Sequence, residues 1–386
     1  MREVAILGIG QTPVGEHWDQ SLKQIAAEAV RAVVQDAQID QADGLFVGNM
    51  LSGLLDSQHD LGTFVAGQAG LRGIEAIKVD AACGSGGAAC RTALTAVVSG
   101  AMETAIVVGV EKMTDRPGNE VTGALVTAAD ADFESALGMS FVAINALLMQ
   151  AYMHAYGWPH ADFAPFSINA HANAQHNPYA RLREPITEKQ YGQARMVADP
   201  INLLDASPIG DGAAAIVLVP AEVARRRTGK RPIVTIAAST AASDSIAIHD
   251  RYNTLELAAA RQSAERAYAQ AGLTPDDIDV FELHDAFSIM AAMSLEAAGF
   301  AERGQGPRLG LDGQIGPNGK VPIATRGGLK ARGHPVGATG VYQLVEVFQQ
   351  LVGEAGATQV PSAKVGMAQS IGGSGAAVIT HILRAE

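Results

Sequence analysis

The sequence predicts an α/β protein in which one structural unit occurs twice. Three observations indicate this class. Short buried-strand runs alternate with alanine-rich helical stretches, 42 glycines accompany few aromatic residues, and the order of elements in the first half recurs in the second. Glycine-rich turns and close helix–sheet packing are typical of α/β proteins. With 386 residues, 48% of them apolar, the chain is long enough for two domains with a large core.

The elements of the first half follow one another as strand, helix, strand, glycine turn with helix, and strand. They are predicted over residues 4–8, 22–37, 43–49, 84–98 and 105–109. The second half repeats this order over residues 232–236, 255–271, 279–285, 333–351 and 364–367. Strands that alternate with helices of this length predict parallel sheets covered on both faces, and two copies predict two such layers packed together. Chance resemblance between alanine-rich helices is the alternative, but the ordered recurrence favours a duplication.

We therefore expect an N-terminal half over 1–230 and a C-terminal half over 231–386. Within the first, a region of about 113–205 is rich in His, Asn, Pro and aromatic residues and is interpreted as an insertion rather than sheet. Long insertions usually carry binding surfaces. Residues 210–218 close this half as a turn that leads into a buried strand, and Asp211 is interpreted as a turn or cap residue rather than a catalytic acid.

The formal net charge of −12 argues against nucleic acids and anionic membranes as partners, because both require a basic surface. One dense basic stretch contains Arg225, Arg226, Arg227, Lys230 and Arg231. We interpret it as a solvated surface turn; the alternative is a contact site for a phosphate-bearing ligand such as coenzyme A. No apolar run approaches the roughly 18 residues that span a bilayer, and the first residues indicate a strand rather than a signal peptide.

The two cysteines, Cys83 and Cys90, are predicted to be free thiols. If the segment between them is helical, seven residues rise about 10.5 Å, which exceeds the roughly 7 Å limit between the Cα atoms of a disulfide. Free thiols fit a reducing cytoplasm, where we expect the protein to work.

Cys83 is the candidate nucleophile. A predicted strand ends at this residue, a glycine turn follows, and a helix begins directly afterwards. The N-terminus of a helix is expected to lower the pKa of the thiol, and free backbone N–H groups of the turn can bind an oxyanion. A buried structural cysteine is the common alternative, but the position at a strand-to-helix turn favours the nucleophile. Cys90, two turns into an apolar helix, is interpreted as a core residue.

Three further clusters end strands or precede helices. His334 stands between glycine and proline at the start of a helix, which suits a rigid acid or base; a loop histidine satisfied by local hydrogen bonds is equally compatible. His284 ends a buried strand, at the crevice where α/β sheets bind ligands. Ser370 and Gly372 lie where another strand enters a glycine loop, whose amides could complete an anion hole.

Six motifs, in order and across nearly the whole chain, resemble those of the thiolase family. They are Cys-Gly-Ser-Gly at 83–86, Glu-Lys-Met at 111–113, Gly-Asp-Gly-Ala-Ala at 210–214, His-Asp-Ala-Phe at 284–287, Gly-His-Pro-Val-Gly-Ala-Thr-Gly at 333–340 and Ile-Gly-Gly at 371–373. Residues 171–174 and 177–180, with His-Asp at 284–285, are similar to the archaeal and sterol-carrier-protein type of thiolase. We expect no sterol-carrier domain after the thiolase part.

The resemblance implies a five-layer α/β/α/β/α sandwich, a homodimer or dimer of dimers, and an acyl-CoA C-acyltransferase of the acetyl-CoA acetyltransferase or 3-ketoacyl-CoA thiolase kind. In the implied ping-pong reaction, Cys83 takes the acyl group from acyl-CoA and His334 is its base. His284 binds the thioester oxygen or a water, and the amides of Cys83 and Gly372 form a second oxyanion hole. Coenzyme A thioesters are substrates; no metal or permanently bound cofactor is implied.

The chain departs from the family pattern at one point. Thiolases carry a second cysteine that removes the α-proton, but the two positions where it occurs hold Ser370 and Ala286. A serine hydroxyl is a poor base near neutral pH, so His284 or His334 must do this work. Two alternatives stay open. One is a weakly active acyl-CoA-binding subunit that needs a partner, such as a small zinc-ribbon/OB protein. The other is a retro-aldol lyase on CoA thioesters, which the presence of Cys83 disfavours.

Overall fold

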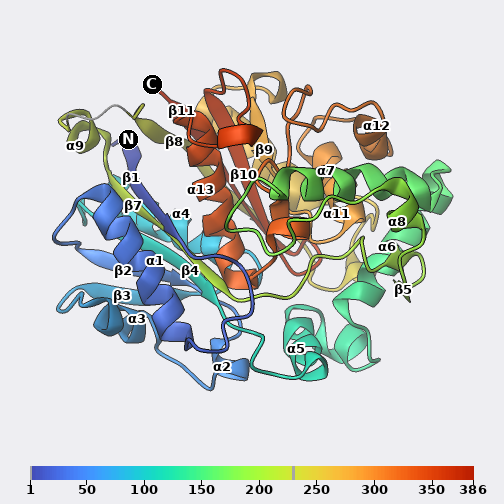
Figure 1. Ribbon diagram of the computed structural model, residues 1–386, viewed down its shortest axis with the longest axis horizontal. Coiled ribbons are helices and arrows are strands. Elements are labelled where there is room, and N and C mark those ends of the chain that lie inside the picture. The colour runs from blue at the N-terminus through green and yellow to red at the C-terminus, as the bar shows by residue number, and fades with distance from the viewer. Residues whose placement is uncertain (1, 228–230) are drawn as a thin grey trace.

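A computed structural model describes residues 2–227 and 231–386, and Figure 1 shows two half-molecules, each built on its own group of strands. Within the described residues, nine strands are hydrogen-bonded in the order β3-β2-β4-β7-β1-β8-β11-β10-β9. Their bounds are β1 Val4–Gln11, β2 Gly44–Gly48, β3 Glu75–Val79, β4 Ala105–Glu111, β7 Gly212–Pro220, β8 Val234–Ser243, β9 Val280–Glu282, β10 Val365–Gly372 and β11 Ala377–Ala385. Only two residue pairs, Ala5 with Thr235 and Ile6 with Val234, join β1 to β8 and so connect the halves.

The two groups of strands are mixed, so the prediction of parallel sheets is wrong. In the first half β3, β2 and β4 are parallel, whereas β7 runs antiparallel to both β4 and β1. In the second half β9 and β10 are parallel, whereas β11 runs antiparallel to both β10 and β8. The last connection shows the reason. Only four residues separate β10 from β11, and a parallel crossover needs a dozen or more.

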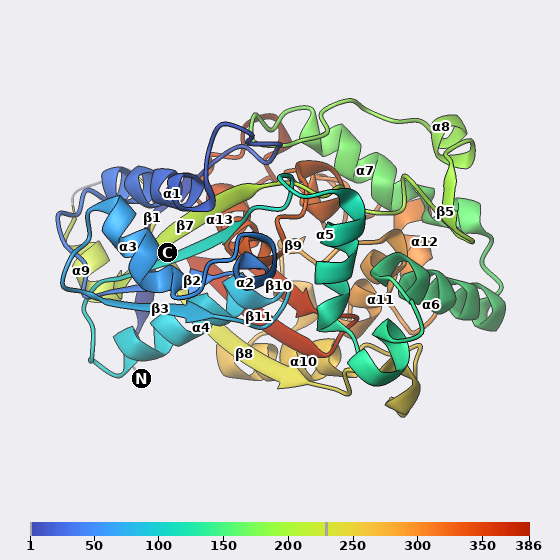
Figure 2. The ribbon, with the colours of Figure 1, turned by 90° about the horizontal axis from the view of Figure 1, so that it is seen from below.

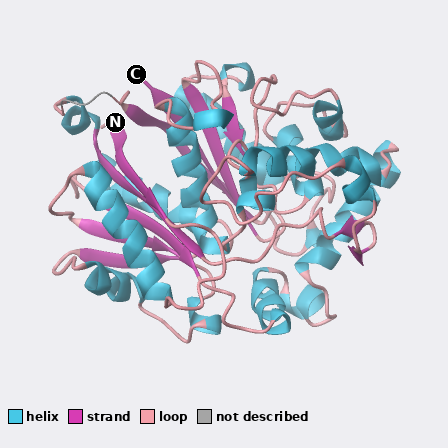
Figure 3. Cartoon of the chain, viewed as in Figure 1, coloured by secondary structure: helices cyan, strands magenta, loops and turns pink. Residues whose placement is uncertain are grey.

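Helices cover these strands in five layers, as the resemblance implied. The helices α1 (Leu22–Ala37) and α3 (Leu61–Ala69) pack on the outer face of the first half. The outer face of the second half is covered by α10 (Ala258–Ala271), and α11 (Ser288–Ala297) packs against α10. Between the two groups of strands lie α4 (Ser85–Val98) and α13 (Thr339–Leu351), which pack against each other (Figures 1 and 3).

The central pair of helices approach closely because glycine faces glycine. A β-carbon on Gly340 at the start of α13 would overlap the backbone of Gly87 in α4, and one on Gly86 would press on the carbonyl of Gly337. Two of the predicted motifs, at 83–86 and 333–340, therefore meet at this contact. It brings the strand-to-helix turn of one half beside the corresponding turn of the other.

The region predicted as an insertion is mainly helical and packs beside the second half (Figure 2). It contains α5 (Gly118–Leu125), α6 (Phe141–Tyr156), α7 (Ala164–Ala174), α8 (Glu188–Gly192) and a small pair of strands, β5 (Met196–Ala198) and β6 (Ile201–Asn202). Backbone hydrogen bonds from Arg181 and Leu182 to the carbonyls of Arg332 and Ala331 attach it to the segment that precedes His334.

The basic stretch lies at the junction of the halves. Arg225 forms ion pairs with Glu3 and Glu386, and Arg231 with Asp36 and Glu354. Local carboxylates therefore neutralise these arginines, which favours the surface-turn interpretation. Lys230 lies outside the described residues. In the part of the chain that the structure describes, no helix has the length and apolar character needed to cross a bilayer.

Candidate active site

Cys83 lies in a tight turn between β3 and α4. Ala82, just before it, adopts a left-handed backbone with φ of 53°, which costs a non-glycine residue free energy and is common at functional turns. The Ser85 hydroxyl fixes the turn, because it donates to the carbonyl of Ala82 and accepts from the N–H of Ala81 at 2.9 Å. A strand-to-helix turn of this kind presents a nucleophile at the end of a sheet.

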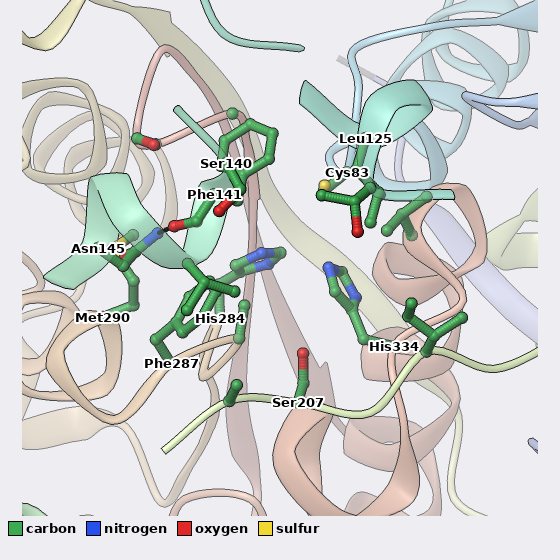
Figure 4. A pocket seen from close by; sticks show the side chains of 18 of the residues that line it. Cys83, Leu125, Ser140, Phe141, Asn145, Ser207, His284, Phe287, Met290 and His334 are labelled. Carbon is green, nitrogen blue, oxygen red and sulfur yellow. Dashed lines mark hydrogen bonds between the residues drawn. The ribbon is translucent and has the colours of Figure 1, made fainter. Parts of the chain in front are cut away.

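The structure brings three predicted residues, Cys83, His284 and His334, into one pocket of about 200 Å³ (Figure 4). Its remaining walls are mostly apolar and come from α5, α6, α11 and the segment 206–209. They include Met113, Leu125, Phe141, Val142, Phe287 and Met290. The predicted insertion therefore supplies much of the pocket wall.

The hydrogen bonds of His334 make it a proton acceptor toward the pocket. Its Nδ1 lies 2.7 Å from the Thr339 hydroxyl, and that hydroxyl donates to the carbonyl of Pro335 at 3.4 Å. Both bonds form together only if Nδ1 carries the proton and donates it to Thr339. The Nε2 atom then has a free lone pair, which is what a general base needs.

His284 has the opposite tautomer. The backbone N–H of Ile371 donates to its Nδ1 at 3.3 Å, so the proton of the neutral ring is on Nε2. The two rings meet edge to face with their centroids 5.1 Å apart. One neutral imidazole can therefore accept a proton while the other donates a hydrogen bond.

Burial keeps both rings uncharged. It lowers the pKa of His284 to about 3, and the positive charge of Arg332 lowers it further in the same direction. Burial is also the main reason why the pKa of His334 is well below its ordinary value, and the nearby His284 and Arg332 lower this pKa further. Arg332 is itself fully buried, with Nε 2.9 Å from a Glu346 carboxylate oxygen and its guanidinium 4.6 Å from the ring centre of Tyr342.

The predicted lowering of the Cys83 pKa is wrong. Burial, and next the nearby carboxylate of Glu111, raise the pKa of this thiol to about 12, although the N–H groups of Gly373 and of Cys83 itself act in the opposite direction. Glu111 is held in place by the N–H groups of Met50, Leu51 and Gly337 at 2.9–3.0 Å. The free protein therefore carries a thiol rather than a thiolate, and a base must remove its proton during attack.

This protonation state predicts how alkylation of Cys83 depends on pH. Because the pKa is raised, the thiolate fraction is small at pH 7, and it should rise about tenfold per pH unit up to pH 9. The second-order rate of Cys83 carboxamidomethylation by iodoacetamide, followed by mass spectrometry of the Cys83 peptide, should rise with the same slope. A plateau already reached below pH 7 would reveal a preformed thiolate–imidazolium pair and contradict this assignment.

Two other predicted residues lie outside the lining of the pocket. The Ser370 hydroxyl is buried against Gly87 of α4 and has no hydrogen-bond partner among the described residues. Gly372 packs on the carbonyl of Ala81, and its neighbours Gly373 and Ser374 line the pocket instead. Because the N–H of Gly373 faces the sulfur, Gly373 is better placed than Gly372 to bind an oxyanion beside Cys83. Ala286, at the other family position for a second cysteine, lines the pocket but carries no ionisable group.

Two buried polar residues of the pocket were not predicted as site residues. Ser374 and Asn145 are 5% and 2% exposed, and the Ser374 hydroxyl and the Asn145 Oδ1 have no hydrogen-bond partner within residues 2–227 and 231–386. The signal that could have identified Asn145 is an amide in the otherwise apolar run 141–149.

Asp211 and the second cysteine have structural roles. Asp211 is buried and accepts from the N–H groups of Met113 and Thr114 at 2.7 and 3.0 Å, as expected of a turn residue. Cys90 is a free thiol in the core between the layers, as predicted. Within the described segments, no group of three or more His, Cys, Asp or Glu side chains is arranged to bind a metal ion.

Comparisons with known proteins identify the class. The model of the thiolase N-terminal domain matches residues 4–222, and that of the thiolase C-terminal domain matches residues 240–385. The chain therefore belongs to the thiolase family, and the resemblance inferred from its motifs is confirmed.

Individual relatives refine this assignment. The chain is 43% identical to an acetyl-CoA acetyltransferase of Methanothermobacter thermautotrophicus over 99% of both chains. It is 29% identical to human sterol carrier protein 2, over 98% of this chain and 72% of that protein. A solved structure titled Ltp2-ChsH2(DUF35) aldolase matches with a TM-score of 0.85 and 24% identity, over 99% of this chain and 98% of that one. The last match supports the fold.

Proposed function

We propose that this thiolase is an acyl-CoA C-acyltransferase that carries the acyl group on Cys83 in a ping-pong reaction. The observation that supports this best is the combination in one pocket of a thiol, an accepting imidazole and a donating imidazole. A nucleophile, its base and a hydrogen-bond donor for a carbonyl oxygen are the groups that acyl transfer requires.

In the first half-reaction, His334 Nε2 takes the proton of Cys83 as the sulfur attacks the thioester carbonyl of acyl-CoA. The N–H groups of Cys83 and Gly373 bind the developing oxyanion. The bond to the CoA sulfur then breaks, and the leaving thiolate takes the proton back from His334. The products are acyl-Cys83 and free coenzyme A.

In the second half-reaction, a second acyl-CoA donates its α-proton to His334 Nε2. His284 Nε2–H binds the thioester oxygen and stabilises the enolate that forms. The enolate carbon attacks the acyl carbon of acyl-Cys83, the bond to the Cys83 sulfur breaks, and the thiolate takes the proton from His334. Because Ser370 lies outside the pocket lining and Ala286 is not ionisable, His334 is the base in both steps.

The names of the curated relatives suggest acetyl-CoA and acetoacetyl-CoA as substrates. We expect the purified protein to cleave acetoacetyl-CoA with coenzyme A into two molecules of acetyl-CoA, measured by product chromatography. The same protein should acetylate Cys83 from acetyl-CoA. If neither product nor adduct forms, the acyltransferase assignment is wrong.

A second candidate is a thiolase that needs a partner protein. One relative, 30% identical over 96% of this chain and 95% of its own length, is named a benzoylsuccinyl-CoA thiolase subunit of Thauera aromatica, which suggests assembly with another chain. A Cys83 adduct without thiolysis by the protein alone would favour this candidate, and a small zinc-ribbon/OB protein is then the partner to add. A retro-aldol lyase is the less favoured alternative because Cys83 and both histidines are present.

We further propose a homodimer, or a dimer of dimers, in the cytoplasm. β3 is an edge strand of the described sheet and its Ile77 is 47% exposed, so this edge is open to pairing with a second copy. Two free cysteines suit a reducing compartment.

A further inference from the structure

Glu111 is a buried carboxylate near the thiol that the proposed reaction does not use. It ends β4, is fully buried, and accepts hydrogen bonds from four N–H donors, which occupy both of its oxygens. Oε1 accepts from Asn49 Nδ2 at 2.7 Å and from the N–H of Leu51 at 3.0 Å. Oε2 accepts from the N–H groups of Met50 at 3.0 Å and of Gly337 at 2.9 Å. The carboxylate therefore binds two separate segments of the chain at once.

The two segments belong to different halves of the molecule. Residues 49–51 follow β2 and lead into α2 (Ser52–Leu55), whereas Gly337 lies in the turn between His334 and α13. Glu111 therefore joins the loop that carries the base to a turn of the first half, across 226 positions of sequence. A hydrogen bond to a charged acceptor is stronger than one between neutral groups, and the buried surroundings strengthen it further.

The loop that Glu111 holds also packs closely on the turn of the first half. A β-carbon on Gly337 would lie 2.6 Å from the Asn49 Cα and 2.7 Å from Glu111 Oε2, so a larger residue requires a shift of the loop. Val336, the neighbour of Gly337, belongs with Cys83 to one buried apolar cluster. The segment that Glu111 holds is therefore part of the packing around the thiol.

We propose that Glu111 is a positioning residue, which holds the loop of His334 at the place from which Nε2 reaches the Cys83 thiol. The proposal rests on the acyltransferase function, in which His334 removes the proton of Cys83. Glu111 does not line the pocket, so it acts through the imidazole and not on the substrate. Proton transfer requires donor and acceptor within hydrogen-bond reach, so a small shift of the loop is enough to slow it.

Two substitutions loosen this contact in different ways. Glu111→Gln keeps the size of the side chain but replaces one oxygen with an NH₂ group, which cannot accept from the N–H donors that face it. Gly337→Ala keeps the carboxylate and displaces the loop sterically, so it also serves if the first variant does not fold. Burial raises the pKa of Glu111 to about 7, so the carboxylate is ionised at pH 8. At this pH each substitution should slow acetylation of Cys83 by acetyl-CoA about tenfold or more.

Repeating both substitutions in the His334→Asn protein separates positioning from a general structural role. Neither should slow acetylation further there, followed over hours by intact-mass analysis, because the group that they displace is already absent. Glu111→Gln should even raise the rate in that background, since loss of a negative charge near Cys83 favours the thiolate. A loss by a similar factor in both backgrounds would show that Glu111 maintains the pocket in general, and would overturn the proposal.

Asp279→Asn is the matched control. Its carboxylate likewise accepts from two backbone N–H groups, those of Lys364 and Val365 at 2.7 and 2.9 Å, but at the start of β10, whereas the pocket adjoins the other end of that strand. It should be acetylated at the wild-type rate. If the wild-type protein forms no acetyl adduct, the acyltransferase function itself fails. If the wild-type protein, Glu111→Gln and Gly337→Ala are all acetylated at the same rate, only the positioning role is wrong.

Discussion

Replacing Cys83 with alanine should abolish the acetyl adduct and lower thiolysis by about 10⁴-fold or more, because no other group in the pocket can form the thioester. Incubation with acetyl-CoA followed by intact-mass analysis measures the adduct, and a thiolysis assay measures the rate. The removed side chain is small and lies at the edge of a pocket, so the variant should stay folded.

Cys90→Ala is the matched control. It removes the same chemical group from the same helix region, but Cys90 is in the core between α4 and α13 and does not line the pocket. This variant should form the adduct at the wild-type level. Only its free energy of unfolding should fall, by about 1–2 kcal/mol. An adduct that persists in Cys83→Ala and vanishes in Cys90→Ala would exchange the two assignments and invalidate the proposed site.

His334→Asn should lower kcat/KM by about 10²–10⁴-fold, the usual contribution of a general base. The effect should appear in both half-reactions, since the same Nε2 is proposed to take the Cys83 proton and the α-proton. Because the thiol pKa is raised to about 12, the variant has little thiolate at pH 7. Its rate of Cys83 acetylation should therefore rise steadily as the pH is raised to 9.

His154→Asn controls for the substitution itself. His154 is exposed on α6, the helix that also lines the pocket, and it has no place in the pocket lining. It should leave acetylation and thiolysis unchanged. If His334→Asn lowers kcat/KM by less than tenfold at neutral pH, another group takes the Cys83 proton.

The features that could be predicted from the sequence have local signals. The helix at 22–37 has the bounds that were predicted. Its apolar spacing and the turns on either side of it are local signals that the sequence shows directly. Cys83, His284 and His334 were found because each follows a strand or precedes a helix, and the ends of strands converge in an α/β fold. The structure places these three side chains around one pocket.

The features that could not be predicted depend on tertiary packing. The antiparallel direction of β7 is set by its pairing with β4 and β1, which are both distant from it in sequence. The Cys83 pKa depends on burial and on Glu111, a residue of a different strand. Whether Ser370 faces the pocket or α4 depends on the close approach of Gly87. Each of these properties depends on neighbours distant in sequence.

Groups from the other half of the chain complete the site around Cys83, so the site cannot form before that half has been synthesised. The thiol is encoded early, but both imidazoles and the Gly373 amide are translated much later. A nascent polypeptide on the ribosome therefore carries a cysteine that lacks its base and its anion-binding amide. Reactivity toward thioesters begins only when the last strands, β10 and β11, have docked.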